Sequence, residues 1–488
     1  MGLVRAVPIV VAAAAVVTIA ISGGDRADPR TPPGLPGLPP PFLGTAVVGS
    51  GGRTVAVDAY GDVVDLRTPG PAGRALVAVP AARQAAGTVP AAAAIVARMR
   101  LRDGRSLPFW RAGSVRQRYL PGTNVLRTVA RFGSRRFVVV RRIGGPNAAA
   151  ADRRWLTRAR PLGPSAPKWA RRMYERSLLM LRALTDRRTG AVVAGARDGW
   201  AYVWPRDAGT VAIAFASAGY RPESRRVARF LLDLDLSTAA RFRGTGAPVP
   251  GRAAQGDAAG WIAAAARAAG LPAPHPPAGW TDQADYQEGD GGGFLANAIA
   301  STATFADKRK TSPRKARQTP RQAARIRRLF ETPRGLVREA GDPNSSLDSA
   351  AAWAVRPFPL PALFPAVRRT LHRIVADRES RFGIVPSEDW PGGEDPWTAP
   401  TAWTAWALGA LAREEGRKTR WSRAIARRDR RAALRLMTDL RRAATPLGLL
   451  PERVDARTGI PRSTTPLAWS HAFAVLALRE LWPRGPVG

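Results

Sequence analysis

The chain contains no cysteine and only three histidines, His275, His372 and His471. The absence of cysteine excludes disulfides and thiolate metal sites. Three histidines scattered through 488 residues argue against a multi-histidine zinc site. We therefore expect no metal and no other cofactor, and any catalysis should depend on carboxylates.

The sequence also lacks a glycine-rich phosphate loop and an interleaved aromatic and basic pattern, so we expect no nucleic-acid partner. This expectation holds despite a formal net charge of +39. The excess is almost all arginine and is spread along the chain. Such a spread is more typical of an effect of genome composition on amino-acid usage than of a binding surface. Its densest cluster, Lys308–Arg328, could hold the protein against an anionic cell-envelope surface. A protein that only binds polyanions remains the most distant functional alternative.

The N-terminus carries an export pattern. Arg5 precedes an apolar run over residues 6–22, and Ala20-Ile21-Ser22 is a poor match to a small-x-small cleavage site. The run therefore favours an uncleaved membrane anchor over a cleaved signal peptide. Residues 28–41 are rich in proline and glycine and predict an extended linker, so residues 1–41 form an anchor or signal plus linker. We expect the folded part to lie outside the cytoplasm.

A chain of this length is expected to form two domains. Residues 42–150 contain short β-branched runs separated by turns, including residues 45–48, 53–57 and 135–141. Several short strands of this kind predict a β-sandwich.

Residues 164–488 change to helical periodicity, beginning with a helix over 167–185. Two helix types then alternate. Amphipathic helices with arginine on one face are expected at 224–234, 321–330, 364–377 and 430–443. Helices that are apolar or small on every face are expected at 207–219, 257–269, 291–302, 347–355, 396–412 and 466–481. Helices of the second type must be buried, so the pattern predicts an all-α (α/α)6 toroid with one outer helix missing near 270–280.

The loops that enter the buried helices are rich in aromatic and acidic residues, and loops on rigid scaffolds carry function. Aromatic faces cover the apolar side of a sugar ring, while carboxylates and arginine–aspartate pairs bind its hydroxyls. For a single loop, a helix cap and a core tryptophan explain the residues equally well. Several such loops at one end of their helices favour a carbohydrate substrate.

One of these loops, Tyr202-Val203-Trp204-Pro205-Arg206-Asp207-Ala208, resembles the signature of glycoside hydrolase family 15, the glucoamylase family. Further matches follow in the family's order: 48–62, 117–126, Gln255-Gly256-Asp257, Gly392-Gly393-Glu394-Asp395-Pro396-Trp397, Gly448-Leu449-Leu450-Pro451-Glu452 and Trp469-Ser470-His471. The resemblance implies the bacterial type of the family, with a sandwich before the toroid. It also implies an inverting hydrolase that acts on α-linked glucosides.

The same resemblance implies the site residues. Glu452 matches the general base and Glu288 matches the general acid, with Asp285 and Asp290 in reserve. Substrate-binding roles fall on Trp204, Arg206, Asp207 and Trp397. Inversion requires the two carboxyls to stand roughly 6.5–9.5 Å apart, with water between.

Two other functions stay open. Because the motif around Glu288 departs from the family's tryptophan followed by two glutamates, the chain could be a non-catalytic carbohydrate-binding relative. A phosphorylase would share the architecture, but Glu452 in the base position argues against it. The sequence leaves the particular α-glucoside undetermined.

Overall fold

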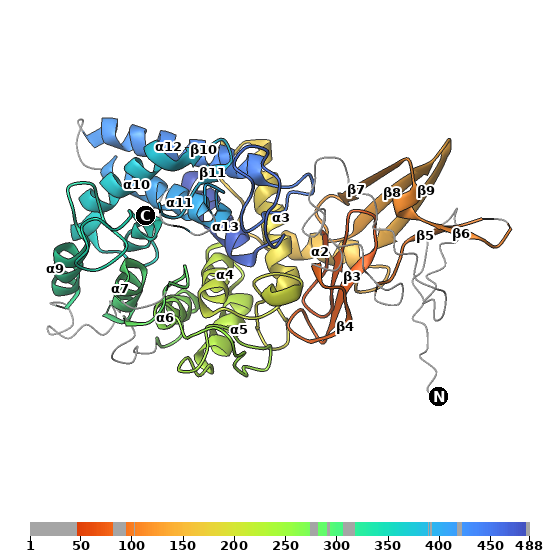
Figure 1. Cartoon of the computed structure of the whole chain (residues 1–488), viewed down its shortest axis with the longest axis horizontal. Coiled ribbons are helices and arrows are strands. Elements are labelled where there is room, and N and C mark those ends of the chain that lie inside the picture. Colours follow the sequence, from red (N-terminus) through yellow and green to blue (C-terminus); the bar gives the residue numbers. More distant parts are fainter. Residues whose placement is uncertain are drawn as a thin grey trace.

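The computed structural model describes residues 46–81, 94–101, 103–273, 282–289, 293–305, 318–388, 390, 393–416 and 422–484. A strand-rich region lies at one end of the long axis, and a larger helical region occupies the rest (Figure 1). This order confirms the coarse prediction of strands followed by helices.

The strand-rich region consists of short antiparallel strands in three sheets. The sheets are ordered β1-β2-β3-β4, β5-β6 and β7-β8-β9. Their strands are β1 (Ala46–Gly49), β2 (Thr54–Val57), β3 (Val63–Thr68), β4 (Arg74–Ala78), β5 (Arg98–Arg100), β6 (Ser106–Pro108), β7 (Ser114–Tyr119), β8 (Leu126–Phe132) and β9 (Arg135–Arg141). The predicted strands at 45–48, 53–57 and 135–141 are β1, β2 and β9. The β-branched runs pair across tight turns, as expected.

A buried junction joins the two regions. The Tyr119 hydroxyl at the end of β7 hydrogen-bonds the backbone of Val47 in β1. The Asn124 amide donates to the carbonyl of Gly49 (2.9 Å) and to that of Leu179 (2.8 Å), which lies in the first long helix. Arg176 of that helix returns a bond to the Asn124 side-chain oxygen at 3.0 Å. The strand-rich region is therefore tied to the helical region by satisfied polar groups as well as by apolar packing.

The helical region follows the predicted alternation closely. Its α-helices are α2 (Ala148–Leu156), α3 (Lys168–Leu184), α4 (Pro205–Ser217), α5 (Arg221–Leu232), α6 (Ala258–Ala269), α7 (Leu295–Ser301), α9 (Gln318–Phe330), α10 (Phe364–Arg378), α11 (Thr398–Glu415), α12 (Ser422–Ala443) and α13 (Ala468–Leu481). A short hairpin, β10 (Glu379–Ser380) and β11 (Gly383–Ile384), follows α10. One predicted buried helix differs: residues 349–354 form a 3₁₀ helix. Pro357 disfavours α geometry in the residue before it and so prevents a longer helix.

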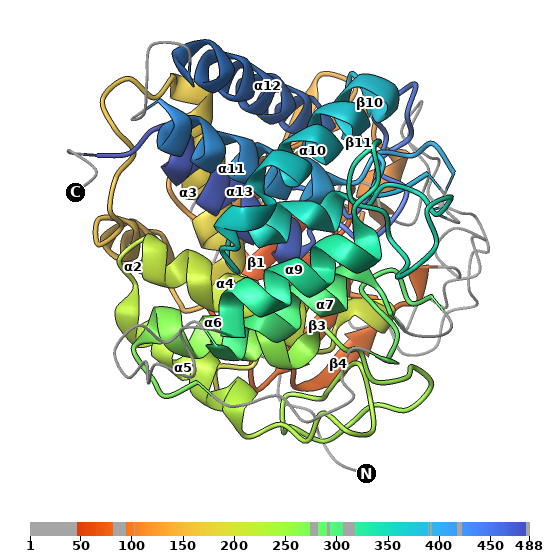
Figure 2. The same cartoon turned by 90° about the vertical axis from the view of Figure 1, so that its left-hand side faces the viewer.

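The buried elements close on themselves. α4 packs on α6, α6 on α7, α7 on the 3₁₀ helix Ser349–Ala354, that helix on α11, α11 on α13, and α13 on α4. α5, α10, α12 and α3 pack outside this series, and α9 contacts α7. Figure 2 views the molecule from its helical end, with the strands behind the helices. Backbone bridges such as Gln255–Ala284, Asp348–Ser387 and Trp397–Arg453 join the loops that precede these elements, so those loops converge.

Three predictions fall on residues that the structure does not describe. These are the apolar run at 6–22 with its linker, most of the 270–280 stretch and Asp290. The basic cluster Lys308–Arg328 is described only from residue 318, where α9 begins. In the part of the chain that is described, no helix has both the length and the apolar character needed to span a bilayer.

Candidate active site

Arg206 and Asp207 lie in the first turn of α4, where a proline at the first helical position fixes the start of the helix. The Arg206 guanidinium donates to the Gln255 side chain at 2.8 Å and pairs with Asp257 at 3.2 Å, just before α6. Asp207 lies 3.7 Å from the same guanidinium. The structure thus brings together two of the sequence motifs, 202–208 and 255–257.

Burial dominates the electrostatics of this cluster. It raises the pKa of Asp207 to about 7, although the adjacent Arg206 lowers it and the charges of Glu452 and Asp257 raise it further. Burial also raises the pKa of Asp257, again opposed by Arg206. Because the charge of Glu452 raises the pKa of Asp207, the predicted base belongs to the same cluster as Arg206 and Asp207.

Glu452 lies in the loop before α13, and its backbone is fixed on both sides. Its carbonyl accepts from the Thr398 amide at 3.0 Å, and its amide donates to the Thr464 carbonyl at 2.9 Å. The Ser463 hydroxyl donates to its carboxylate. Burial raises the pKa of Glu452; hydrogen bonds from Ser463 and Trp200 lower it, and the charge of Glu288 raises it. A carboxylate held by two donors in this way is kept in one orientation.

Glu288 lies on a different loop from Glu452, the loop that precedes α7. Its backbone has a φ of 58°, which is uncommon for a residue other than glycine. Its half-exposed carboxylate forms an ion pair with Arg252, from the loop before α6. The charge of Glu288 acts on both Glu452 and Arg206. Glu288 is therefore near the predicted base, but it already has a cationic partner.

The two predicted tryptophans lie at the starts of buried helices. Trp204 precedes α4 and is buried, with the guanidinium carbons of Arg241 and Arg252 5.7 Å and 5.9 Å from its ring. Trp397 precedes α11, and its ring packs edge-on against Trp390 at 4.7 Å. Trp397 also forms a backbone bridge with Arg453, which places it next to Glu452.

An aromatic layer lies beneath the polar groups. Trp469, near the start of α13, lies under the Arg206 guanidinium at 4.7 Å. It packs on Trp403 at 5.0 Å, which in turn contacts Trp353 at 5.5 Å, and Trp353 contacts Trp261 at 5.0 Å. These four rings come from four different buried elements, so the layer both joins the helices and fixes the rim residues above it.

Several buried polar atoms near this layer have no hydrogen-bond partner among the described residues. They include Arg206 Nε, Asp285 Oδ2 and Asp348 Oδ2. Asp285 is paired with Arg338 at 3.0 Å through its other oxygen, and Asp348 accepts from the Tyr286 hydroxyl at 2.7 Å. Burial raises the pKa of Asp348 to about 7, and the charge of Asp285 adds to this effect. Buried polar atoms without a partner are rare in proteins, and a bound polyhydroxyl compound could satisfy such atoms.

The sequence analysis missed three residues of the site. Arg252 occurs among many arginines, and nothing in its sequence context singles it out. Ser463 precedes the last buried helix by five residues and reaches Glu452 only through the loop fold. Trp200 lies in one of the aromatic loops, but its hydrogen bond to the Glu452 side chain forms only when two distant loops meet in the folded chain. Within the described ranges, no group of three or more histidine, aspartate or glutamate side chains is arranged to hold a metal ion.

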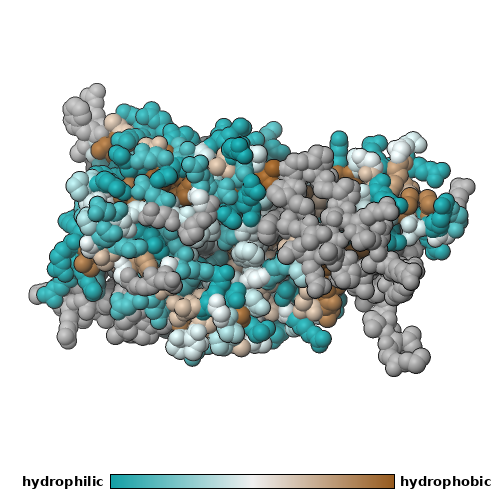
Figure 3. All heavy atoms as spheres, in the orientation of Figure 1, coloured by the Kyte–Doolittle hydropathy of each residue, from teal (hydrophilic) through white to brown (hydrophobic). Residues whose placement is uncertain are grey.

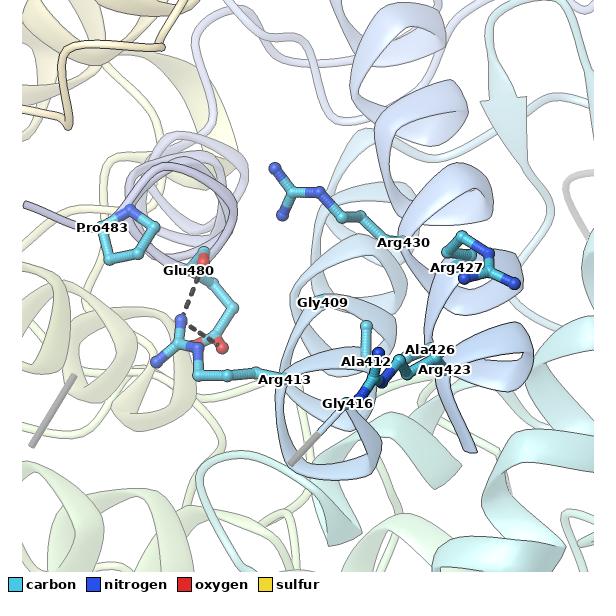
Figure 4. Close-up of a pocket in the computed structure, with 10 residues that line it drawn as sticks. All are labelled: Gly409, Ala412, Arg413, Gly416, Arg423, Ala426, Arg427, Arg430, Glu480 and Pro483. Carbon is cyan, nitrogen blue, oxygen red and sulfur yellow. Dashed lines mark hydrogen bonds and ion pairs between the residues drawn. The ribbon is translucent and has the colours of Figure 1, made fainter. Parts of the chain in front are cut away.

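A cavity of about 480 Å³ lies elsewhere, between the C-terminal ends of α11 and α13 and the start of α12 (Figure 4). Two of the four arginines that line it bond the end of α13. Arg413 donates to the Glu480 carbonyl at 2.7 Å and pairs with the Glu480 carboxylate, and Arg430 donates to the Leu481 carbonyl at 3.1 Å. These bonds satisfy the last carbonyls of α13. The cavity is thus at the opposite helix ends from the cluster around Glu452.

Comparison with known proteins agrees with this geometry. Residues 168–241 match the family model described as glycosyl hydrolases family 15. No curated protein sequence matches the chain.

Solved structures match over longer stretches. A bacterial glucoamylase complexed with acarbose has a TM-score of 0.60 at 11% identity, covering 96% of this chain and 97% of that one. The glucoamylase of Saccharomycopsis fibuligera has a TM-score of 0.52 at 12% identity, with 66% and 96% covered. A glycosidase structure has a TM-score of 0.50 at 18% identity, with 64% and 97% covered. The resemblance to glycoside hydrolase family 15 that the sequence motifs indicated is thus confirmed, by the family model over residues 168–241 and by the fold over both regions.

Proposed function

We propose that the chain is an inverting glycoside hydrolase that acts on α-linked glucosides, with its site at one rim of an (α/α)6 toroid. The observation that carries this proposal is the electrostatic coupling of Glu452 and Glu288. The two carboxyls come from different loops, and the charge of Glu288 affects the pKa of Glu452. A family resemblance, an arginine–aspartate cluster and an aromatic layer at the same rim support it.

Glu452 is proposed as the general base. Its carboxylate takes a proton from a water molecule, and the water oxygen forms a bond to the anomeric carbon. The bond from that carbon to the leaving oxygen breaks as Glu288 gives that oxygen a proton. The water attacks from the face opposite the leaving group, so the product has inverted configuration. The donors Ser463 and Trp200 support this role, because they hold the carboxylate in place before the reaction.

Substrate binding is proposed for Arg206, Asp207, Trp204 and Trp397. Arg206 is oriented by Gln255 and Asp257, which leaves its unpartnered Nε as a donor for a sugar hydroxyl. Asp207 is held close to the same guanidinium and can accept from a hydroxyl. Preorganised polar groups of this kind bind hydroxyls without reordering.

A second function has one specific observation in its favour. Glu288 already forms an ion pair with Arg252, so its carboxylate has a partner other than a substrate oxygen. A chain in which this pair persisted with sugar bound would bind carbohydrate without cleaving it. The chain would then be a non-catalytic relative of the same fold.

The domain limits and location remain part of the proposal. Residues 1–41 would anchor or export the chain, residues 42–150 would form a β-sandwich, and residues 164–488 would form the catalytic domain outside the cytoplasm. The helical boundary is supported by α3, which begins at Lys168 and packs on α13.

The decisive experiment follows the anomer of the first product by NMR. The protein is incubated with α-glucosides of several linkages, including maltose-type and isomaltose-type chains and trehalose. We expect release of β-glucose from at least one of them. If the glucose whose anomeric carbon is attacked emerged in the α configuration, the inverting mechanism would be excluded. Binding without hydrolysis across the panel would favour the non-catalytic function.

A further inference from the structure

The outer face of the sheet β7-β8-β9 carries a dense group of arginines. Residues 114–142 contain eight arginines and neither aspartate nor glutamate. Strand residues alternate between faces, and the register pairs Arg118 with Arg127 and Arg131 with Arg136. Five guanidinium groups therefore extend from one face, which we call the arginine face: Arg116, Arg118, Arg127, Arg131 and Arg136.

In the part of the chain that the structure describes, no acid neutralises these arginines. Among the described residues, none of the five forms an ion pair with a carboxylate. In the helical region, by contrast, many exposed arginines are paired, as in Arg327–Glu331, Arg373–Asp377 and Arg435–Glu379. A high arginine content throughout the chain explains neither the absence of acids here nor the confinement of the group to one sheet face.

The shape and chemistry of the arginine face favour an extended anionic surface. The face is built on one antiparallel sheet, so its groups lie at strand spacing of about 4.8 Å across the sheet. The remaining positions on it are largely aliphatic: Val129 and Val138 are half-buried, and Val140 is 40% exposed. Its aromatic neighbours Phe132 and Phe137 lie on the opposite face and pack on each other at 5.8 Å. The face therefore lacks the stacking platform that single-stranded nucleic acid needs.

The position of the face fits a membrane. It lies at the strand-rich end of the molecule, away from α7 and α9 (Figure 1). Hydrophilic and hydrophobic atoms are interspersed at this end (Figure 3). The strand-rich region is also the first described part of the chain after the apolar run at 6–22 that predicts an anchor. We propose that the arginine face docks on a bilayer that contains anionic lipids, where it binds their phosphate headgroups and orients the molecule relative to the membrane.

The test uses the full-length chain and two variants of equal net charge. The face variant replaces Arg116, Arg118, Arg131 and Arg136, all exposed, with glutamine. The control variant replaces Arg423, Arg427, Arg428 and Arg431 with glutamine; these are exposed on α12 and, among the described residues, form no ion pair. All three proteins keep the apolar run at 6–22, so its contribution to vesicle binding is the same in each and does not affect the comparison. Circular dichroism and thermal melting confirm that both variants fold.

Binding is measured by flotation with vesicles of phosphatidylcholine alone and of phosphatidylcholine with phosphatidylglycerol. A basic residue at an anionic surface contributes about 1 kcal/mol, so we expect the face variant, which lacks four of them, to lose roughly 1,000-fold of its preference for the anionic vesicles. The control variant should lose less than about threefold, and raising the salt should abolish the difference.

Three outcomes would overturn the proposal. An equal loss in both variants would mean that net charge alone attracts the lipid. No loss in the face variant would mean that the arginine face does not bind it. If the face variant keeps its vesicle binding but loses binding to a single-stranded oligonucleotide, measured by fluorescence anisotropy, the partner is nucleic acid instead.

Discussion

The two regions of this molecule bury acidic residues in different ways. In the strand-rich region, Asp58 accepts from the backbone amides of Tyr60 and Asp62 at 2.9 Å each, and Asp62 accepts from Ala97 at 2.6 Å. These acids fix a turn and the strands beside it. In the helical region, Asp285 and Asp348 are just as buried, but each has one carboxylate oxygen without a partner.

The comparison shows that burial alone does not identify a functional acid. Burial raises the pKa of Asp58 to about 6 and that of Asp348 to about 7. The difference lies in their hydrogen bonds: Asp58 accepts from two backbone amides, whereas Asp348 accepts from the Ala350 amide and the Tyr286 hydroxyl through one oxygen, and its other oxygen has no partner among the described residues. Acids of the second kind are the ones expected to contact a ligand.

The strongest test of this distinction is Glu452→Gln. If Glu452 is the base, the variant should lose roughly 10²–10⁴-fold in hydrolysis rate, because an amide cannot take the proton from water. Sugar binding, measured by calorimetry, should stay within a few-fold of the wild type. Glu414→Gln, which changes an exposed glutamate at the end of α11, is the matched control and should be fully active. Full activity in Glu452→Gln would place the base elsewhere.

Glu288→Gln tests the acid. Natural glucosides should be hydrolysed roughly 10²–10⁴-fold more slowly, because their leaving oxygen needs a proton. Glucosyl fluoride, whose leaving group needs little protonation, should be affected far less. An equal loss on both substrates would indicate a structural role, and unchanged turnover of natural glucosides would direct attention to Asp285 and Asp290.

The junction between the regions can be broken with Asn124→Ala. The change removes donors to Gly49 and Leu179 and leaves both buried carbonyls and the Arg176 guanidinium with one partner fewer. We expect the free energy of unfolding to fall by about 2–4 kcal/mol in urea denaturation. Asn124→Asp restores only the acceptor and should recover part of this loss. A change in the free energy of unfolding below about 0.5 kcal/mol, measured in matched buffers, would mean that the junction contributes little to stability.

The last prediction concerns the dependence of stability on pH. The folded pKa of Asp348 is raised from 3.8 to about 7, so its protonated form contributes stability that is fully present below pH 3.8 and is lost as the pH rises through 7. Asp348→Asn should therefore flatten the decline in unfolding free energy between pH 4 and pH 7, by about 4 kcal/mol for a shift of this size. Asp233→Asn, at an exposed position after α5, should leave that decline unchanged. Parallel pH profiles for Asp348→Asn and the wild type would contradict this prediction.

Much of the architecture followed from periodicity. The runs at 53–57 and 135–141 predicted strands because short β-branched runs bounded by turns favour that structure. The helices α4, α6, α11 and α13 were predicted to be buried because they are apolar or small on all faces, and they are. The sequence did not predict the 3₁₀ geometry at 349–354, since a short buried alanine-rich segment suits either helix type.

The candidate site divides in the same way. The resemblance to glycoside hydrolase family 15 indicated Arg206, Asp207 and Glu452, because each stands within one of the motifs that carry that resemblance. Arg252, Ser463 and Trp200 could not be found in this way. Their partners are 36, 11 and 252 residues away in the chain, and only the folding of the loops brings the side chains together. The sequence by itself thus determined which helices are buried and which acids stand at their starts, because both depend on local pattern; the tertiary structure decided which charges those acids meet, because that depends on contacts between distant loops.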